Sequence, residues 1–131
     1  MVAMKKSTGF NNVVISVGTS GQKRIAESVL PYYEKRYNTA FSVIVDGDAG
    51  KRIGSGGALL KALNHYSSIE DIDRQKNLVI LTGGISKRVP GFSVRGKAFV
   101  PLGLSDDGRE ICVLDLILEN ANALARRMDA G

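Results

Sequence analysis

Two basic residues and a group of glycines in the second half of the chain are the residues best suited to chemistry. Arg88 and Lys97 lie in residues 78–101, where an apolar run is followed by glycines and basic residues. Glycine has no Cβ, so the backbone N–H groups beside it can approach phosphate oxygens closely. The planar guanidinium of Arg88 suits one phosphate group, and the compact ammonium of Lys97 can meet a second. This segment is therefore predicted to hold the phosphates of a nucleotide.

The distribution of charge favours a small polyanion as the partner. The chain has 131 residues and a net charge of +5, and residues 74–105 contain six basic residues and no acidic one. A positive block in a glycine-rich loop suits a small polyanion, whereas surfaces that bind single-stranded nucleic acid combine basic residues with aromatic stacking platforms. The chain has no Trp. We therefore expect no nucleic-acid partner.

Two known phosphate-binding motifs fit the glycines poorly. Residues 91–98 have the spacing of a P-loop, but Ala98 stands where a Ser or Thr should meet magnesium. That motif also needs a strand before it and a helix after it, and the flanking prolines oppose both. The run Gly54-Ser55-Gly56-Gly57 resembles the start of a dinucleotide fingerprint, but Leu59 replaces its third glycine. Neither motif is predicted.

Metal and nucleophilic chemistry have weaker support in the sequence. Asp46 and Asp48 could form a metal-binding pair, but a turn at the end of a strand is favoured there. His65 is the only histidine, and no Ser or Cys has a plausible histidine partner. Cys112 is the only cysteine and is expected to be a buried thiol of a cytoplasmic protein. No metal ligand is predicted in this chain.

The hydrophobic pattern alternates between strands and helices, which predicts an α/β fold in a single domain. Strands are predicted at residues 12–17, 41–45, 77–82, 98–102 and 110–113, and helices at 22–37, 58–66 and 115–128. This order predicts a Rossmann-like, three-layer domain with a mostly parallel sheet covered on both faces. Ligands of such sheets bind beyond the carboxyl ends of the strands. The glycine-rich residues 46–57 and 83–96 both follow strands, so we expect them to converge on one site.

Several local features are predicted within these elements. Ser20 is expected to cap the first helix and Pro31 to kink it. The second helix is expected to bury its leucines, and the last to carry basic residues in its final turn. A hairpin turn is expected at residues 106–108. The leucines are Leu59, Leu60 and Leu63, and the basic residues are Arg126 and Arg127.

Two motifs together resemble a known enzyme family. Gly83-Gly84-x-Ser86-x-Arg88-x-Pro90, followed by Gly96-Lys97 and Pro101, resembles the signature loop of sugar-nucleotidyltransferases, also called sugar-nucleotide pyrophosphorylases. The closer match is to fucose-1-phosphate guanylyltransferases, including the bifunctional fucokinase–guanylyltransferases. That family also carries a GSGGA stretch upstream, which corresponds to Gly54-Ser55-Gly56-Gly57-Ala58 here. The resemblance covers about residues 40–125 and includes the order and spacing of both motifs.

The resemblance implies transfer of a nucleotidyl group from GTP or another nucleoside triphosphate to a sugar-1-phosphate, with release of pyrophosphate. Arg88 and Lys97 would act on the phosphates, and the nucleotide would lie against the glycine-rich segments. The residues implied in nucleotide binding are Gly54, Ser55, Gly56, Gly57, Gly83, Gly84 and Ser86. Members of the family are several times longer than this chain. It is therefore expected to be an N-terminal portion, with the magnesium ligands of the full enzyme outside it.

The sequence also fits other functions for this chain. A non-catalytic nucleotide-binding module or an inactive fragment would carry the same phosphate-binding residues. Base and sugar rest on the family resemblance alone. We expect no membrane partner, because the longest apolar runs have the length of strands. An apolar face where further chain would pack is expected to be exposed, and it could drive formation of a homo-oligomer.

Overall fold

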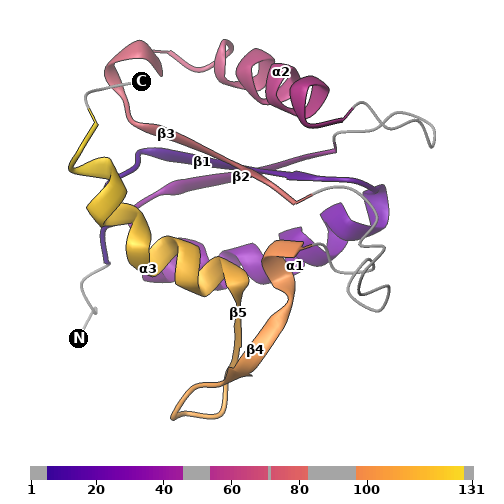
Figure 1. Cartoon of the computed structure of the whole chain (residues 1–131), viewed down its shortest axis with the longest axis vertical. Helices are drawn as coiled ribbons and strands as arrows, with labels where there is room; N and C mark the ends of the chain where they lie inside the picture. The colour runs from indigo at the N-terminus through magenta and orange to yellow at the C-terminus, as the bar shows by residue number, and fades with distance from the viewer. Residues whose placement is uncertain (1–5, 46–53, 71, 83–96, 129–131) are drawn as a thin grey trace.

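The computed structural model describes residues 6–45, 54–70, 72–82 and 97–128. Within these residues it contains a three-stranded parallel sheet, a two-stranded antiparallel hairpin and three α-helices (Figure 1). The α/β class and the parallel sheet predicted from the sequence are confirmed. The segments 46–53 and 83–96 lie outside the described residues, and the second of them contains Gly83, Gly84, Ser86 and Arg88 of the predicted site.

The sheet is built around the first strand. The strands β1 (Asn12–Val17), β2 (Ala40–Val45) and β3 (Asn77–Leu81) are arranged in the order β2-β1-β3. Both neighbours run parallel to β1, with Asn12 opposite Ala40 on one side and Asn77 on the other. Residues 13–17 are all buried, as expected for a central parallel strand, and all of them except Ser16 are apolar. The predicted bounds of all three strands are correct to within one residue.

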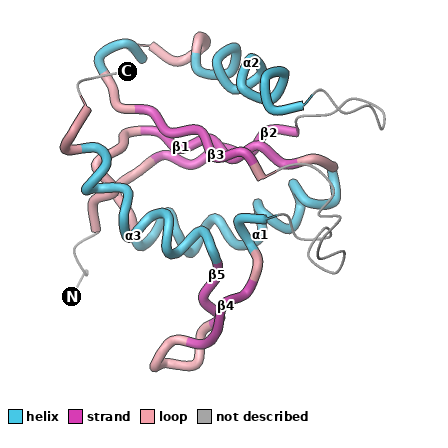
Figure 2. Tube along the Cα trace, viewed as in Figure 1, coloured by secondary structure: helices cyan, strands magenta, loops and turns pink. Residues whose placement is uncertain are grey.

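Helices cover both faces of the sheet, as predicted. The helices α1 (Ser20–Arg36) and α3 (Val113–Ala125) lie on one face and α2 (Gly54–Tyr66) lies on the other (Figure 2). Successive side chains of a strand point to opposite faces, and β1 follows this rule. Val13, Ile15 and Val17 join the larger hydrophobic cluster, which contains residues of α1 and α3. Val14 joins a smaller cluster with Ala62 and Tyr66 of α2.

The start of α1 differs from the prediction by one residue. Thr19, not Ser20, is the N-cap, and its hydroxyl accepts a hydrogen bond from the backbone N–H of Gln22 at 3.1 Å. Ser20 is already the first helical residue. The difference arises because either hydroxyl can cap a helix, and the extended backbone of Thr19 selects it. Pro31 lies inside the helix with its side chain exposed, and the kink expected there stays a prediction.

The helix α2 corrects two predictions. It begins at Gly54, so the run Gly54-Ser55-Gly56-Gly57 forms its first turn and not the end of a loop. Its buried face consists of small residues and one tyrosine, and not of leucines: Ala58, Ala62 and Tyr66 are buried. Leu59, Leu60 and Leu63 are 43%, 69% and 52% exposed. Alanines allow the helix to lie close to β1, and the hydroxyl of Tyr66 donates to the backbone oxygen of Leu78 at 2.7 Å.

The segment before α3 forms a hairpin that projects from the layer of α1 and α3 (Figure 1). The strands β4 (Pro101–Leu104) and β5 (Glu110–Cys112) pair antiparallel, and the predicted turn at residues 106–108 is confirmed. Gly108 has a φ of 82°, which glycine adopts without strain. The predicted strand at 98–102 is partly wrong, because Lys97–Phe99 is a 3₁₀ turn, η3, and Pro101 begins β4. A second 3₁₀ turn, η1 (Ile72–Arg74), precedes β3.

The helix α3 begins and ends slightly earlier than predicted. Cys112 is its N-cap, and the carboxylate of Asp115 accepts a hydrogen bond from the Cys112 backbone N–H at 2.8 Å. The helix ends at Ala125, so the basic pair at 126–127 follows the helix and does not occupy its last turn. A lysine from a distant part of the chain takes that place: Lys76 Nζ donates to the backbone oxygen of Ala125 at 2.6 Å.

Candidate functional site

The carboxyl ends of the three parallel strands meet at one edge of the sheet. The strands end there at Val17, Val45 and Leu81, and the N-termini of α1 and α2 open to the same edge (Figure 1). Unpaired backbone N–H groups and the positive end of the helix dipole favour an anion at such a position. This edge is therefore where an open parallel sheet is best suited to hold a ligand.

The turn between β1 and α1 satisfies its own hydrogen bonds. The backbone N–H of Gly18 donates to Gln22 Oε1 at 2.8 Å, and the side chain of Gln22 is buried. Thr19 caps the backbone of the same helical turn. These donors are already paired within the protein. The segments that follow β2 and β3 are the better candidates for contact with a ligand.

The end of β3 is fixed by a threonine. Both the backbone N–H and the hydroxyl of Thr82 donate to the backbone oxygen of Ser16, at 2.8 and 3.1 Å. This pairing carries the contact with β1 one residue beyond Leu81. It also holds the chain at the carboxyl edge immediately before the predicted phosphate-binding segment 83–96.

A buried hydroxyl lies one residue before the end of β1. The Ser16 side chain is fully buried, and its Oγ makes no hydrogen bond with the described part of the chain. Side chains alternate along β1, so Ser16 shares with Val14 the face that α2 covers. Buried hydroxyls normally have a partner. Ser16 is thus a polar group close to the carboxyl edge with hydrogen-bonding capacity unused among the described residues.

The structure places only part of the sequence-predicted site. Gly54, Ser55, Gly56 and Gly57 form the N-terminal turn of α2, which opens to the carboxyl edge. Lys97 begins η3, and the structure gives no description of its side chain. The expected convergence of the two glycine-rich segments stays a prediction. The remaining predicted residues, Gly83, Gly84, Ser86 and Arg88, lie outside the described residues.

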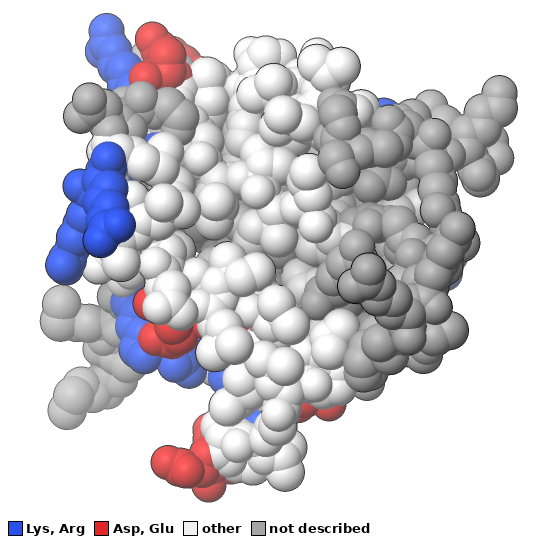
Figure 3. Space-filling model, viewed as in Figure 1, with Lys and Arg blue, Asp and Glu red and all other residues white. Residues whose placement is uncertain are grey.

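The positive block at residues 74–105 is less concentrated on one site than its sequence suggests. Arg74 belongs to η1 and Lys76 precedes β3, so both lie at the amino end of the strand, opposite the carboxyl edge. Lys76 is engaged with the end of α3. In the view of Figure 3, most of the basic side chains that can be seen lie on the left, where Figure 1 shows the end of α3 and the start of β3. Arg74 and Lys76 therefore do not contribute to the predicted phosphate site.

The described residues do not fit a magnesium site. No group of three or more His, Cys, Asp or Glu side chains gathers anywhere in the described part of the chain. His65 lies in the last turn of α2, with its ring 6.1 Å from that of Tyr66. Asp46 and Asp48 fall outside the described residues.

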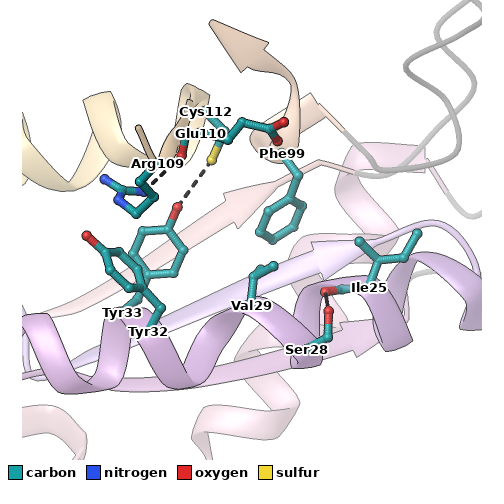
Figure 4. A pocket seen from close by; sticks show the side chains of 9 residues that line it. All are labelled: Ile25, Ser28, Val29, Tyr32, Tyr33, Phe99, Arg109, Glu110 and Cys112. Carbon is teal, nitrogen blue, oxygen red and sulfur yellow. Dashed lines mark hydrogen bonds between the residues drawn. The ribbon is translucent and has the colours of Figure 1, made fainter. Parts of the chain in front are cut away.

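A second hollow was not predicted from the sequence. A cavity of about 630 Å³ lies between α1 and the segment that runs from η3 to β5 (Figure 4). Figure 4 shows Phe99 facing Ile25 and Val29 of α1 across it. Its lining is mostly apolar and aromatic. The residues are Ile25, Ser28, Val29, Tyr32, Tyr33, Phe99, Arg109, Glu110 and Cys112.

One wall of this cavity is a buried polar network. The hydroxyl of Tyr33 lies 3.2 Å from Cys112 Sγ and donates to Asp115 Oδ2 at 3.1 Å. The other oxygen of Asp115 accepts a hydrogen bond from Arg109 Nη2 at 3.1 Å. A phenol, a thiol, a carboxylate and a guanidinium from α1, the hairpin and α3 are thereby connected. Of these four side chains, only Cys112 was considered from the sequence, as a buried thiol, and its burial is confirmed.

Burial and the contacts within this network shift the pKa values of Tyr33, Cys112 and Asp115. Burial, with further contributions from the neighbouring Cys112 and Asp115, raises the pKa of Tyr33 far above its usual value. Burial also raises the pKa of the Cys112 thiol. Burial alone would raise the pKa of Asp115, but hydrogen bonds from the Cys112 backbone and from Arg109 outweigh it and lower that pKa. At neutral pH the phenol and thiol are protonated and Asp115 is charged.

Comparison of this chain with protein-family models, with curated proteins and with solved structures finds no match. Among the helices that the structure describes, none is long and apolar enough to cross a membrane.

Proposed function

We propose that this chain binds a nucleoside triphosphate at the carboxyl edge of its sheet. We further propose that it belongs to a sugar-nucleotidyltransferase that transfers the nucleotidyl group of GTP to a sugar-1-phosphate, most simply fucose-1-phosphate. The observation that carries the proposal is topological: the two glycine-rich segments follow β2 and β3 directly, on either side of β1. Parallel strands release both segments at one edge, where ligands of such sheets bind.

Two further observations support a phosphate ligand at this edge. The run Gly54-Ser55-Gly56-Gly57 forms the first turn of α2, where backbone N–H groups have no partner within the helix. The segment 83–97 follows Thr82 and carries Lys87, Arg88, Arg95 and Lys97 with no acidic residue. The order of these motifs is the one that resembles the fucose-1-phosphate guanylyltransferases. A Rossmann-like domain of the nucleotidyltransferase type is the fold proposed with it.

The proposed reaction needs positioning and neutralisation of charge more than covalent catalysis. A phosphate oxygen of the sugar-1-phosphate attacks the α-phosphorus of GTP, the bond to the β-phosphate breaks, and pyrophosphate leaves. Arg88 would hold the triphosphate and Lys97 would lie between phosphates at the reacting centre. Fixed positive charges at these positions stabilise the negative charge that develops during transfer.

Calorimetric titration with GTP tests nucleotide binding. Arg88→Ala and Lys97→Ala are each expected to weaken binding by about tenfold or more, the loss of about one charge-assisted contact. Lys35→Ala is the matched control, because Lys35 is an exposed cation in the last turn of α1, away from the carboxyl edge. Unchanged affinity in both test variants would overturn the phosphate assignment. Parallel titrations with ATP and UTP decide the preference for a base.

Release of pyrophosphate from GTP, magnesium and a set of sugar-1-phosphates tests the reaction. Product formation that is lost in Arg88→Ala and Lys97→Ala supports the transferase. GTP binding without product supports the alternative, a non-catalytic nucleotide-binding module or an inactive fragment. The identity of the accepted sugar-1-phosphate tests the choice of fucose-1-phosphate.

A further inference from the structure

We propose that the unpaired edge of β3, with the helix flanks beside it, is an interaction surface for a second copy of this chain. The two copies would be related by a two-fold axis, and β3 would pair antiparallel with its counterpart in the second copy. This pairing joins the two sheets into one. The proposal does not rest on nucleotide binding.

β3 pairs on one side only with strands of the described sheet, where it stands at the end of the order β2-β1-β3. The backbone N–H of Thr82, directly after β3, donates to the backbone oxygen of Ser16 in β1. Alternate residues of a strand direct their backbone groups to opposite sides. Val79 and Leu81 therefore direct theirs away from β1, to the side where no described strand pairs with them. Such an edge is a template for pairing with another chain.

The helix α2 presents leucines on the same side of the sheet. Lys61 Nζ donates to the backbone oxygen of Val45 in β2 at 3.3 Å, so the flank of α2 that carries Lys61 faces β2. Leu63 lies about 200° around the helix from Lys61, and Leu59 precedes Leu63 by about one turn. Both leucines therefore lie on the flank toward β3, and they are 52% and 43% exposed.

On the other face of the sheet, α3 is the helix nearer to β3. The ring of Tyr33 in α1 lies 6.4 Å from that of Phe41 in β2, which places α1 toward β2. Lys76, directly before β3, donates to the backbone oxygen of Ala125 at the end of α3. The flank of α3 that turns away from α1 therefore lies on the same side as the unpaired edge of β3.

That flank of α3 is apolar. Asp115 and Glu119 both form hydrogen bonds with side chains of α1, which identifies the opposite flank. Ile117 lies about 200° around the helix from each of them, and Leu124 falls on the same flank as Ile117. Leu124 is 51% exposed, and Leu81 at the end of β3 is 42% exposed. Exposed apolar residues of α2, β3 and α3 thus form one surface.

The absence of charge on this surface favours a copy of the same chain as its partner. Residues 77–81 contain no charged residue, and the flanks of α2 and α3 contribute aliphatic side chains. The whole chain has a net charge of +5, so two copies repel each other at most other contacts. Figure 3 shows a broad uncharged surface across the middle of its view, the view in which Figure 1 has α3 in front of α1.

The size of this side of the molecule matches what a dimer needs. α2 and α3 have 13 residues each, which makes them about 20 Å long and about 10 Å across. With the sheet between them, the side measures roughly 20 by 30 Å, or about 600 Å². A stable interface buries roughly 800 Å² on each partner. The surface is therefore close to the size of a standard interface.

The two-fold axis places one leucine opposite its own copy. Val79 is the middle residue of β3 and directs its backbone groups outward, so it is the natural centre of an antiparallel pair. Val79 packs against the cluster that contains Ala62, and Leu63 follows Ala62 in α2. Leu63 is thus level with Val79, and the two copies of Leu63 meet near the axis.

Sedimentation velocity of the full chain tests the proposal. We expect a dimer at about 50 μM, above the micromolar constants of the weakest interfaces of this size. At concentrations below the dissociation constant the chain is a monomer and these leucines are exposed. Leu63→Glu should raise the dissociation constant by about tenfold or more, because like charges then meet near the axis. Leu104→Glu is the matched control on the hairpin, where Leu104 is 72% exposed, and it should leave dimerisation unchanged.

A monomer at about 50 μM, an assembly larger than a dimer, or equal effects of Leu63→Glu and Leu104→Glu would each overturn the proposal. Mixing Leu63→Glu with Leu63→Lys tests the two-fold symmetry. Each variant alone should be monomeric, and the equimolar mixture should restore the dimer, because opposite charges then meet near the axis. A mixture that stays monomeric would overturn the two-fold arrangement.

Hydrogen exchange gives a readout that needs no variant. The amide hydrogens of Val79 and Leu81 should exchange more slowly at high chain concentration than at low concentration, because pairing with the second copy protects them. The amide hydrogens of β4 and β5 should show no such dependence. Exchange at Val79 that does not change with concentration would overturn the pairing of the two β3 strands.

Discussion

The phenol oxygen of Tyr33 in α1 lies 3.1 Å from the carboxylate Oδ2 of Asp115 in α3. The same oxygen of Asp115 accepts the Cys112 backbone N–H at 2.8 Å. The Asp115 carboxylate thus caps the N-terminus of α3. It also joins α3 to α1, which lies on the same face of the sheet. The buried end of α1 and the start of α3 depend on each other through this contact.

Tyr33→Phe removes the hydroxyl from this network while leaving the ring. We expect a loss of about 1.5–3 kcal/mol in the free energy of unfolding, because the lost hydrogen bond has a charged acceptor in a buried position. Urea unfolding followed by circular dichroism measures it. The matched control is Tyr32→Phe, whose half-buried hydroxyl accepts from Arg36 Nη1 at 2.8 Å, and its loss should be smaller. Equal losses in the two variants would contradict the role given to Tyr33.

The stability contributed by Asp115 is expected to depend on pH. Its pKa is lowered in the folded protein, so the charged form favours folding. This contribution is fully present above the unfolded-state pKa of about 4 and is lost as the pH falls through the lower folded-state pKa. Asp115→Asn should therefore cost about 1–3 kcal/mol at neutral pH. The difference from wild type should shrink as the pH falls below about 4.

Urea unfolding of both proteins across this acidic range gives the comparison. A stability difference that stays constant with pH would contradict the lowered pKa. Glu119→Gln is a useful second variant, because a hydrogen bond from Tyr37 and the nearby Lys6 and Arg36 also lower the pKa of Glu119. Glu119 is exposed, so its pH-dependent contribution should be the smaller.

Two glycines separate backbone strain from steric overlap. Gly9 and Gly108 have similar positive φ values, 79° and 82°. A Cβ at Gly9 would lie 2.5 Å from the Cβ of Ala125, whereas nothing lies within 4 Å of one at Gly108. Gly108→Ala should cost about 1–2 kcal/mol from strain alone. Gly9→Ala should cost a further 1–3 kcal/mol or so, since α3 must shift. Similar melting temperatures for the two variants would contradict the close packing of Gly9 against α3.

The buried face of α2 gives another matched pair. Ala62 is fully buried against β1, and Leu63 beside it in sequence is 52% exposed. Ala62→Leu should lower the free energy of unfolding by about 1–3 kcal/mol through overpacking. Leu63→Gln should change it by no more than about 0.5 kcal/mol, as for most surface substitutions. A larger loss of unfolding free energy in Leu63→Gln than in Ala62→Leu would instead support the buried leucine face predicted from the sequence.

Hydrophobic periodicity was sufficient to predict the sheet and the number of helices found in the described residues. The run at residues 13–17 has no polar alternation because β1 is covered on both faces. Periodicity failed at α2 because it weights each position by hydrophobicity, which favours leucine over alanine. Because α2 lies close to the sheet, alanines and not leucines occupy its buried face. The start of α2 at Gly54 was not predicted, because glycine is a poor helix former.

The sites were predictable to different degrees. Both glycine-rich segments could be assigned to strand ends, because a strand and the residues after it are neighbours in sequence. The cavity could not be predicted from the sequence. It depends on how Tyr33, Phe99 and Cys112 meet, and the first and last of these are 79 residues apart along the chain. No local pattern encodes such a contact.

β1 is the first strand of the described chain and also the middle strand of its sheet. A ribosome that makes this chain therefore releases the strand with the greatest need for partners first. β2 can pair with β1 once Val45 has been made. The other edge of β1 stays unpaired until β3, which ends at Leu81, has also been made. Until then an apolar strand edge is open to other nascent chains. We expect slow synthesis between these two points to be the stage at which a chaperone has most effect on yield.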